Sequence, residues 1–252
     1  MDDIPGKIID NSATIPGYHR LTVRLEKPIG KVVPGQFVML KIPDREIFLR
    51  RPFSVYDARD TKLTILYRIV GKGTDALSRA QKQAPVMVLG PLGHGFTIPD
   101  LGVCIVIAGG IGYAGVRLLL RNLGEKAILF LGIGGVNELP LISDLKGIEV
   151  VTATLDGSYG YHGTVVSLFR EHFGSYRTKD PTIFACGPKG MIISLKEFLE
   201  PHKVPCQVSI EERMACGLGL CFGCVAETKD EINPYKRVCK EGPVFELWDL
   251  SL

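Results

Sequence analysis

The sequence carries little excess charge and has no long apolar run. Thirty Lys and Arg residues against 27 Asp and Glu residues leave a net charge of +3, which gives no reason to expect nucleic acid or a membrane surface as a partner. The longest uncharged run, residues 101–116, has sixteen residues and five glycines, so it is too short and too rich in glycine to span a bilayer. No internal repeat or low-complexity tract is present.

The N-terminus also lacks a targeting pattern. It begins with Met1, Asp2 and Asp3, without the basic-then-apolar order of a signal peptide. Seven cysteines, four of them spaced like metal ligands, fit a reducing compartment better than an export pathway. We therefore expect a cytoplasmic protein.

The most informative stretch contains four cysteines near the C-terminus. Cys216, Cys221 and Cys224 form a C-x4-C-x2-C loop, and Cys239 follows fifteen positions later. This is the plant-type ferredoxin spacing for a [2Fe–2S] cluster. A structural zinc site is the alternative, but zinc ribbons usually present two short C-x2-4-C knuckles rather than a loop of three cysteines.

Three glycines alternate with these cysteines. Three thiolates from one short loop converge on a small cluster only if the backbone turns tightly, and glycine takes a positive φ at little steric cost. We therefore expect Gly217, Gly219 and Gly223 to adopt positive φ.

Residues 1–98 predict an antiparallel β-barrel, because short alternating strands are separated by Pro and Gly turns. Two segments in it carry polar groups: Arg51-Pro52-Phe53-Ser54, and residues 68–74 followed by a short helix. We expect Thr74 to be the N-cap of that helix, whose N-terminus suits a phosphate. Taken alone, each segment is equally consistent with a surface charge or an ordinary capped turn.

Residues 99–210 predict an α/β domain with a doubly wound parallel sheet, because continuous apolar strands alternate with amphipathic helices. In such a sheet, ligands bind beyond the carboxyl ends of the strands. Glycines follow three of the predicted strands, within residues 109–112, 132–135 and 185–188. The first group is not the G-x-G-x-x-G fingerprint, so the glycines indicate either a nucleotide site or tight strand-to-helix turns.

The three parts complement one another chemically. A [2Fe–2S] cluster carries single electrons, whereas a nicotinamide nucleotide exchanges two electrons as hydride. A flavin accepts a hydride and releases electrons singly, so the phosphate-ready barrel is the natural flavin site. We therefore expect FAD, NAD and a [2Fe–2S] cluster, the last in a small domain of residues 211–252.

The order of these motifs resembles the ferredoxin–NAD(P)+ reductase superfamily. The sequence from Glu211 to Gly217, together with the cysteine loop, is similar to a narrower family: the electron-transfer subunits of bacterial class 1B NAD-dependent dihydroorotate dehydrogenases. The resemblance implies that FAD is held by two segments of the barrel. Their residues are Arg51, Pro52, Phe53, Ser54, Arg68, Ile69, Val70, Gly73 and Thr74.

Within these segments, the resemblance pairs Arg51 with the FAD pyrophosphate and places Ser54 near the N5 edge of the flavin. It also places Gly109, Gly110 and Gly112 at the NAD pyrophosphate, and Cys186 close to the nicotinamide. The cluster ligands it implies are Cys216, Cys221, Cys224 and Cys239. No side chain is assigned as a general acid or base.

The resemblance further implies a partner, an FMN-containing TIM-barrel subunit that oxidises dihydroorotate, in a heterotetramer of two of each chain. The expected function is electron transfer from that FMN through the cluster and FAD to NAD+, in pyrimidine biosynthesis. A flavin and iron–sulfur reductase subunit for ferredoxin, sulfide or hydrogenase partners is the alternative, and a non-catalytic zinc module is another. Residues 132–138, where related reductases often carry a cation, have none, and the carboxylate of Glu138 favours NADH over NADPH. The alternative, that Glu138 is a solvated loop charge, stays open, and it is not assigned as a site residue.

Overall fold

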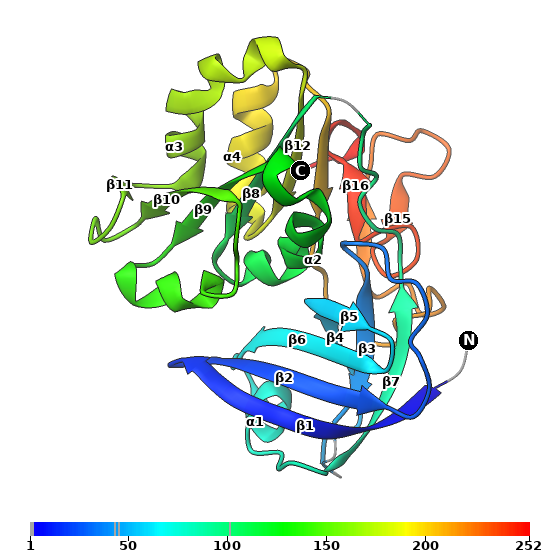
Figure 1. The fold of residues 1–252 in the computed structure, drawn as a ribbon. Helices are drawn as coiled ribbons and strands as arrows, with labels where there is room; N and C mark the ends of the chain where they lie inside the picture. Colours follow the sequence, from blue (N-terminus) through cyan, green and yellow to red (C-terminus); the bar gives the residue numbers. More distant parts are fainter. Residues whose placement is uncertain (1–2, 43, 45, 101) are drawn as a thin grey trace.

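The computed structural model describes residues 3–42, 44, 46–100 and 102–252. Met1 and Asp2 of the acidic N-terminus, and Leu101 of the uncharged run, lie outside these residues. The described chain forms two seven-stranded sheets and one two-stranded sheet. Figure 1 shows the two large sheets one above the other, with the C-terminal segment beside both.

The first sheet is antiparallel and contains only strands from the N-terminal part. Its strand order is β4-β3-β7-β1-β2-β6-β5. Alternating apolar side chains of these strands fill one core inside the curled sheet, which confirms the expected barrel-like fold. The strands are β1 (Asp3–Ile15), β2 (Tyr18–Leu25), β3 (Phe37–Lys41), β4 (Arg51–Ser54), β5 (Asp57–Arg59), β6 (Lys62–Arg68) and β7 (Pro85–Leu92).

Helix α1 (Lys72–Ser78) begins earlier than the sequence predicted. Its N-cap is Gly71, so the expectation that Thr74 is the N-cap was wrong. The Thr74 hydroxyl instead accepts hydrogen bonds from the backbone N–H groups of Val70 at 2.9 Å and Gly71 at 3.2 Å. Because glycine is a poor helix former, Gly73 made the first turn of α1 look non-helical in the sequence.

The second sheet is parallel except at one edge. Its order is β11-β10-β9-β8-β12-β13-β16, and β16 pairs antiparallel with β13. The apolar runs at residues 103–108, 127–131, 149–154, 182–185 and 207–210 predict five of its strands, and each is present within two residues of these bounds, whereas β11 and β16 were not predicted. The strands are β8 (Val103–Gly109), β9 (Ala127–Ile133), β10 (Glu149–Thr154), β11 (Tyr161–His162), β12 (Pro181–Cys186), β13 (Cys206–Ser209) and β16 (Val244–Glu246).

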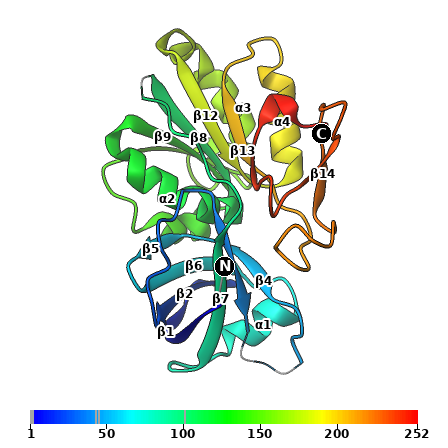
Figure 2. The ribbon, with the colours of Figure 1, turned by 90° about the vertical axis from the view of Figure 1, so that its right-hand side faces the viewer.

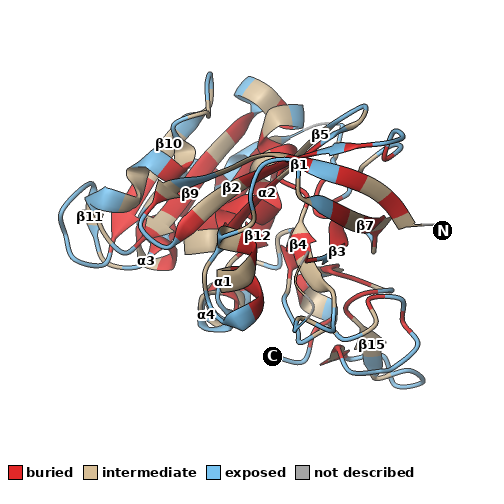
Figure 3. Ribbon diagram, turned by 90° about the horizontal axis from the view of Figure 1, so that it is seen from below, coloured by how far each residue is buried: buried red, intermediate tan, exposed pale blue. Residues whose placement is uncertain are grey.

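Helices cover both faces of this sheet. Helix α2 (Tyr113–Leu123) packs on one face, and α3 (Val165–His172) and α4 (Lys189–Leu199) pack on the other. Figure 3 shows buried positions running through β9, β12 and α2. No helix among the described residues is long and apolar enough to cross a membrane. Short 3-10 turns span Gly110–Gly112, Gly124–Lys126, Val136–Ile142, Phe173–Ser175, Arg177–Lys179 and Leu247–Asp249.

A polar contact fixes the barrel against the parallel sheet. The Asp144 carboxylate accepts a hydrogen bond from the Tyr56 hydroxyl at 2.7 Å and forms an ion pair with Arg117 Nη2 at 3.2 Å. Tyr56 belongs to the barrel, whereas Arg117 lies on α2. The relative position of the two sheets is therefore set by specific side chains.

The C-terminal segment forms a hairpin of β14 (Val225–Glu227) and β15 (Tyr235–Arg237). Figure 2 shows it beside α4 and β13. Its tail is anchored: Trp248 Nε1 donates to the carbonyl of Val204 at 2.9 Å, and the Lys203 ammonium lies 4.5 Å from the indole centroid. Tail and parallel sheet therefore share one core.

Candidate redox site between the two sheets

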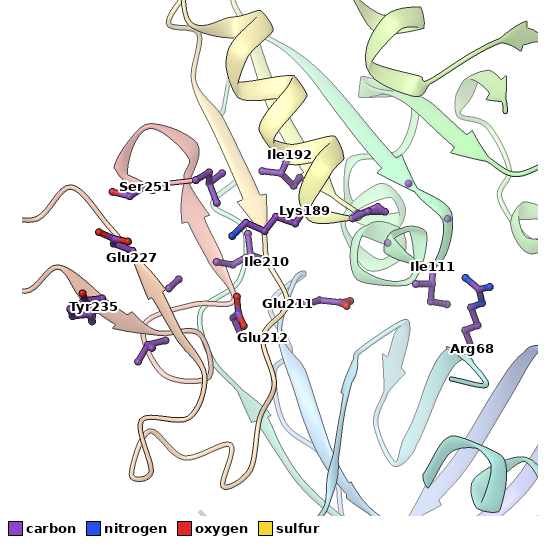
Figure 4. Close-up of a pocket in the computed structure, with 18 of the residues that line it drawn as sticks. Arg68, Ile111, Lys189, Ile192, Ile210, Glu211, Glu212, Glu227, Tyr235 and Ser251 are labelled. Atoms are coloured by element: carbon purple, nitrogen blue, oxygen red, sulfur yellow. The ribbon is translucent and has the colours of Figure 1, made fainter. Parts of the chain in front are cut away.

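A cavity of about 580 Å³ lies where the two large sheets meet the C-terminal segment. Arg68 of the barrel and the turn after β8 form one side, and β14 and β15 form the other. In Figure 4, Arg68 and Ile111 face Tyr235 and Glu227 across this cavity, and the Glu211 side chain points into it. All three parts of the chain therefore contribute to one site.

Glycines bring the ends of β8 and β12 into close contact. A Cβ at Gly112 would lie 2.2 Å from the carbonyl oxygen of Cys186, and a Cβ at Gly109 would lie 2.8 Å from Met191 Sδ. Gly110 has a positive φ of 52°. Helices α2 and α4 begin just after these strands, and Gly112 and Lys189 at their starts line the cavity. Helix N-termini suit a pyrophosphate, because their first N–H groups have no partner within the helix.

A second cavity, of about 410 Å³, continues the first along the ends of β9 and β10. The two share Tyr18, Arg68, Gly109 and Gly110 in their walls. The guanidinium of Arg68 lies 5.6 Å from the Tyr18 ring centroid. Together the cavities form a groove long enough to extend from one side of the parallel sheet to the C-terminal hairpin.

Two carboxylates flank the glycine turn after β9. A Cβ at Gly134 would lie 2.8 Å from Glu138 Oε1, and a Cβ at Gly135 would lie 2.2 Å from Asp156 Oδ2. The Ser158 hydroxyl donates to Asp156 at 2.6 Å, and this bond lowers the pKa of the Asp156 carboxyl. The sequence analysis noted Glu138 but missed Asp156. The pattern that could have identified Asp156 is a carboxylate directly beyond a predicted strand of the sheet.

A smaller hollow of about 140 Å³ lies against the R-P-F-S segment of β4. Pro52, Phe53 and Ser54 form its barrel side, and Ser209 forms part of its opposite side. Glu211, Glu212 and Met214, which lead into the cysteine loop, complete it. These last residues were not predicted as site residues, since their contact with β4 spans more than 150 positions of sequence.

Ser54 and Cys186 meet at the junction of barrel and parallel sheet. A Cβ at Gly115 of α2 would lie 2.8 Å from Cys186 Sγ and 3.6 Å from Ser54 Oγ. Cys186 is fully buried, and burial raises the pKa of its thiol to about 12. The structure thus brings together two residues that the sequence assigned to different cofactors.

The Glu211 side chain lines both the large cavity and the hollow beside β4, and it is exposed to the solvent that fills them. The protein that surrounds it on both sides partly desolvates its carboxyl, and this raises the pKa above the ordinary value. A carboxyl with a raised pKa in a cleft is typical of functional sites.

The two polar segments of the barrel also lie side by side. A Cβ at Gly73 would lie 2.6 Å from Arg51 Nε, so the guanidinium rests directly on the glycine loop. Arg51 Nη1 donates to the carbonyl of Leu49 at 2.7 Å, which helps to orient the guanidinium. Ile69 N donates to the carbonyl of Gly17 at 2.8 Å, and Val70 is exposed.

The four cysteines fall into two neighbouring pairs, Cys216 beside Cys221 and Cys224 beside Cys239, close enough for each pair to affect the ionisation of its members. Cys224 and Cys239 are buried, whereas Cys221 is exposed. Four thiols in two pairs suit a [2Fe–2S] cluster, because each iron takes two protein ligands.

Backbone N–H groups point at these sulfurs. Gly219 N donates to Cys239 Sγ at 3.1 Å, and Leu218 N donates to Cys216 Sγ at 3.4 Å. Burial acts to raise the pKa of Cys216, but the backbone donors outweigh it and lower that pKa to about 6. Burial and the neighbouring Cys224 raise the pKa of Cys239 to about 12. The loop thus stabilises at least one thiolate before any cluster binds.

The prediction of three left-handed glycines was correct for two. Gly217 and Gly219 have φ of 70° and 75°, but Phe222, at 54°, takes the positive φ expected of Gly223. A Cβ at Gly217 would lie 2.6 Å from Met39 Cγ, so the loop packs directly on β3 of the barrel.

Known proteins share this sequence and fold. Residues 211–251 match the family model described as the iron–sulfur cluster binding domain of dihydroorotate dehydrogenase B. A dihydroorotate dehydrogenase B (NAD(+)) electron transfer subunit from Caldanaerobacter subterraneus is 38% identical over 84% of each chain. One from Clostridium acetobutylicum is 35% identical over 95% of this chain and 93% of its own.

The chain belongs to the family of dihydroorotate dehydrogenase B electron transfer subunits. A homolog of this subunit from Aquifex aeolicus is 34% identical over the whole of both chains.

Among solved structures, an NADH-dependent reduced ferredoxin–NADP oxidoreductase covers 98% of this chain and 89% of its own with a TM-score of 0.87 at 23% identity. A ferredoxin NADP+ reductase from Neisseria gonorrhoeae covers 81% of this chain and 92% of its own, with a TM-score of 0.66 at 15% identity. These two likenesses establish that the family has the ferredoxin reductase fold.

Proposed function

We propose that this chain passes electrons from the FMN of a dihydroorotate-oxidising partner, through a [2Fe–2S] cluster and FAD, to NAD+. The observation that carries the proposal is the contact of Gly217 with Met39. Met39 of β3 pairs with Pro52 of β4 in the barrel, so the cysteine loop packs on the strand next to the R-P-F-S segment. FAD, when bound there, supplies a carrier that exchanges hydride with NAD and single electrons with iron and sulfur.

The barrel residues would hold the FAD. Arg51 would pair with its pyrophosphate by charge-assisted hydrogen bonds, and Ser54 would face the flavin ring across the hollow. The Thr74 hydroxyl is already bonded to the backbone of Val70 and Gly71, just before α1, so it would shape the glycine loop. The remaining assigned residues, whose backbone and side chains would line the cofactor, are Pro52, Phe53, Arg68, Ile69, Val70 and Gly73.

The parallel sheet would hold NAD in the groove. Gly109, Gly110 and Gly112 would admit the pyrophosphate at the helix N-termini, and Cys186 would lie beside the nicotinamide, next to Ser54. The carboxylates of Glu138 and Asp156 would accept ribose hydroxyls and repel a 2′-phosphate. We therefore propose NADH rather than NADPH as the working cofactor.

Cys216, Cys221, Cys224 and Cys239 would bind the cluster, one pair to each iron. Apolar side chains surround it on the surface: Leu220 is 77% exposed and Phe222 is 58% exposed. We propose that the partner, a TIM-barrel subunit with FMN, covers this loop in a heterotetramer of two of each chain. A docked partner would bury these side chains and bring its own cofactor close to the cluster.

These assignments divide the chain into an FAD domain of residues 1–98, an NAD domain of residues 99–210 and a cluster domain of residues 211–252. All seven cysteines are free thiols, which supports a reducing, cytoplasmic location.

Co-purification from the native host tests the proposal. The expected product is a brown complex that contains equal amounts of this chain and an FMN protein, with FAD, iron and sulfide in the ratio 1:2:2 per copy of this chain. The complex should reduce NAD+ when dihydroorotate is added. A different partner would reject the assigned oxidation, and a colourless chain with one zinc would reject the electron-transfer function.

A further inference from the structure

Arg237 of β15 contacts the cysteine loop at two of its three residues with positive φ. Its Nη1 donates to the carbonyl of Gly219 at 2.8 Å, and its guanidinium carbon lies 4.8 Å from the centroid of the Phe222 ring. Gly219 and Phe222 both have positive φ. One side chain therefore supports the loop between its first and second cysteines and also between its second and third.

Phe222 needs that support. A bulky residue with positive φ is a genuine outlier, because its Cβ crowds the backbone, and such a conformation persists only where the surroundings enforce it. The Phe222 ring is more than half exposed, so core packing does not enforce it. Stacking of the guanidinium on the ring is the contact that does.

Glu241 fixes the orientation of Arg237. Its Oε2 accepts from Arg237 Nε at 3.0 Å and from the Arg237 backbone N–H at 2.7 Å, and its Oε1 accepts from Nη2. This two-pronged geometry leaves Nη1 free to face Gly219. Both side chains are less than a third exposed.

Arg237 is linked to two of the proposed cluster ligands by short hydrogen-bonded paths. Gly219 accepts from Arg237 Nη1 at 2.8 Å, and its own N–H donates to Cys239 Sγ at 3.1 Å. Val238, the residue after Arg237, donates its N–H to the carbonyl of Cys224 at 2.7 Å. The guanidinium is therefore held beside the loop that carries the ligands.

We propose that Arg237, oriented by Glu241, is a positioning residue that holds the loop in its ligating conformation and raises the reduction potential of the bound cluster. The inference rests on the proposed function, since it assumes a cluster on the four cysteines. Reduction adds one electron and no proton to the cluster, and a fixed positive charge beside two of its ligands favours the more negative state. Arg237 would thereby make the cluster a better acceptor for electrons from the partner.

A redox titration followed by EPR tests the inference on the full chain carrying FAD and cluster. Arg237→Gln should lower the cluster potential, by an amount on the order of tenfold in the one-electron equilibrium, which is 59 mV. Glu241→Gln, which leaves the arginine charge uncompensated, should raise it. Lys236→Gln is the matched control, because Lys236 pairs with Asp230 at 2.6 Å and should leave the potential unchanged.

Opposite shifts in the two variants would support the electrostatic role, and equal or absent shifts with the cluster retained would overturn it. If Arg237→Gln loses its iron and sulfide, Arg237→Lys decides: it keeps the charge without the fork. It should hold a near-native potential with lower iron content, and a lowered potential would overturn the inference. Wild-type chain without iron or sulfide would reject the proposed function instead.

Discussion

The negative charge of Glu211 acts on the buried thiol of Cys186 at the junction of the two sheets. After burial, the charge of Glu211 is the second cause that raises the pKa of Cys186 to about 12. At neutral pH the thiol is therefore protonated, so Cys186 offers shape and a weak S–H donor rather than a nucleophilic thiolate.

Glu211→Gln should stabilise the protein at neutral pH. The pKa of Glu211 is raised in the folded state, so its ionised form lowers stability, and that loss is absent below the unfolded pKa and grows as pH rises through the folded pKa. The melting temperature of the variant should exceed that of the wild type at pH 7.5 and equal it near pH 4. Glu197→Gln, on the exposed side of α4, should change neither value, and an equal rise for both variants would contradict this account.

Gly115→Ala should increase the separation between the barrel side and the parallel-sheet side of the site. Its Cβ would lie 2.8 Å from Cys186 Sγ, so the thiol or α2 must shift, and small displacements at a reacting centre cost about 10- to 100-fold in rate. Stopped-flow reduction of the flavin by NADH measures the loss. Cys186→Ala in the same chain should restore part of the rate by making room, whereas Gly174→Ala, which meets nothing within 4 Å, should have no effect.

Arg51→Ala should weaken FAD binding by about 10- to 150-fold, because a charge-assisted phosphate contact contributes roughly 1.5–3 kcal/mol. Flavin content after dialysis and titration of the apoprotein with FAD measure this. The control is Arg79→Ala, whose guanidinium is exposed and pairs with Asp75 on α1. Unchanged retention in the Arg51 variant would remove Arg51 from the FAD site.

Cys221→Ser should lose the cluster and keep hydride transfer. Cys221 contributes one thiol of the first cysteine pair, whereas the hollow beside Ser54 does not include it. Iron and sulfide should fall to background, and reduction by NADH of a dye that accepts directly from flavin should stay within about twofold of wild type. If dye reduction disappears while FAD stays bound, the proposed order of carriers is wrong.

Asp156→Ser should improve the use of NADPH. Like charges held close together cost several kcal/mol, so removing one of two carboxylates beside the ribose should raise kcat/KM for NADPH by about tenfold, and a double variant with Glu138→Gln should raise it further. Asp230→Ser is a matched change at an exposed carboxylate on the C-terminal hairpin. Equal selectivity in all three variants would place the ribose elsewhere.

The sequence was sufficient where the signal is local. Apolar runs and glycine ends located five of the seven strands of the second sheet to within two residues but missed β11 and β16, and the cysteine spacing identified the loop that the family model also matches. It failed where a contact between residues far apart in the sequence determines the local conformation. Phe222 adopts a positive φ under the guanidinium of Arg237, and the first turn of α1 forms despite Gly73. Glu211 and Asp156 became candidates only when folding placed them in a cavity and beside a glycine turn.

Strand β16 gives the fold a further consequence. Because it returns to pair with β13, everything between Ser209 and Val244 is an excursion that leaves and rejoins one sheet, instead of a module on a hinge. The cysteine loop is therefore anchored to this sheet at both ends, so its distance from the barrel varies less than that of a domain on a flexible linker. Transplanting this loop into another reductase would require its closing strand as well.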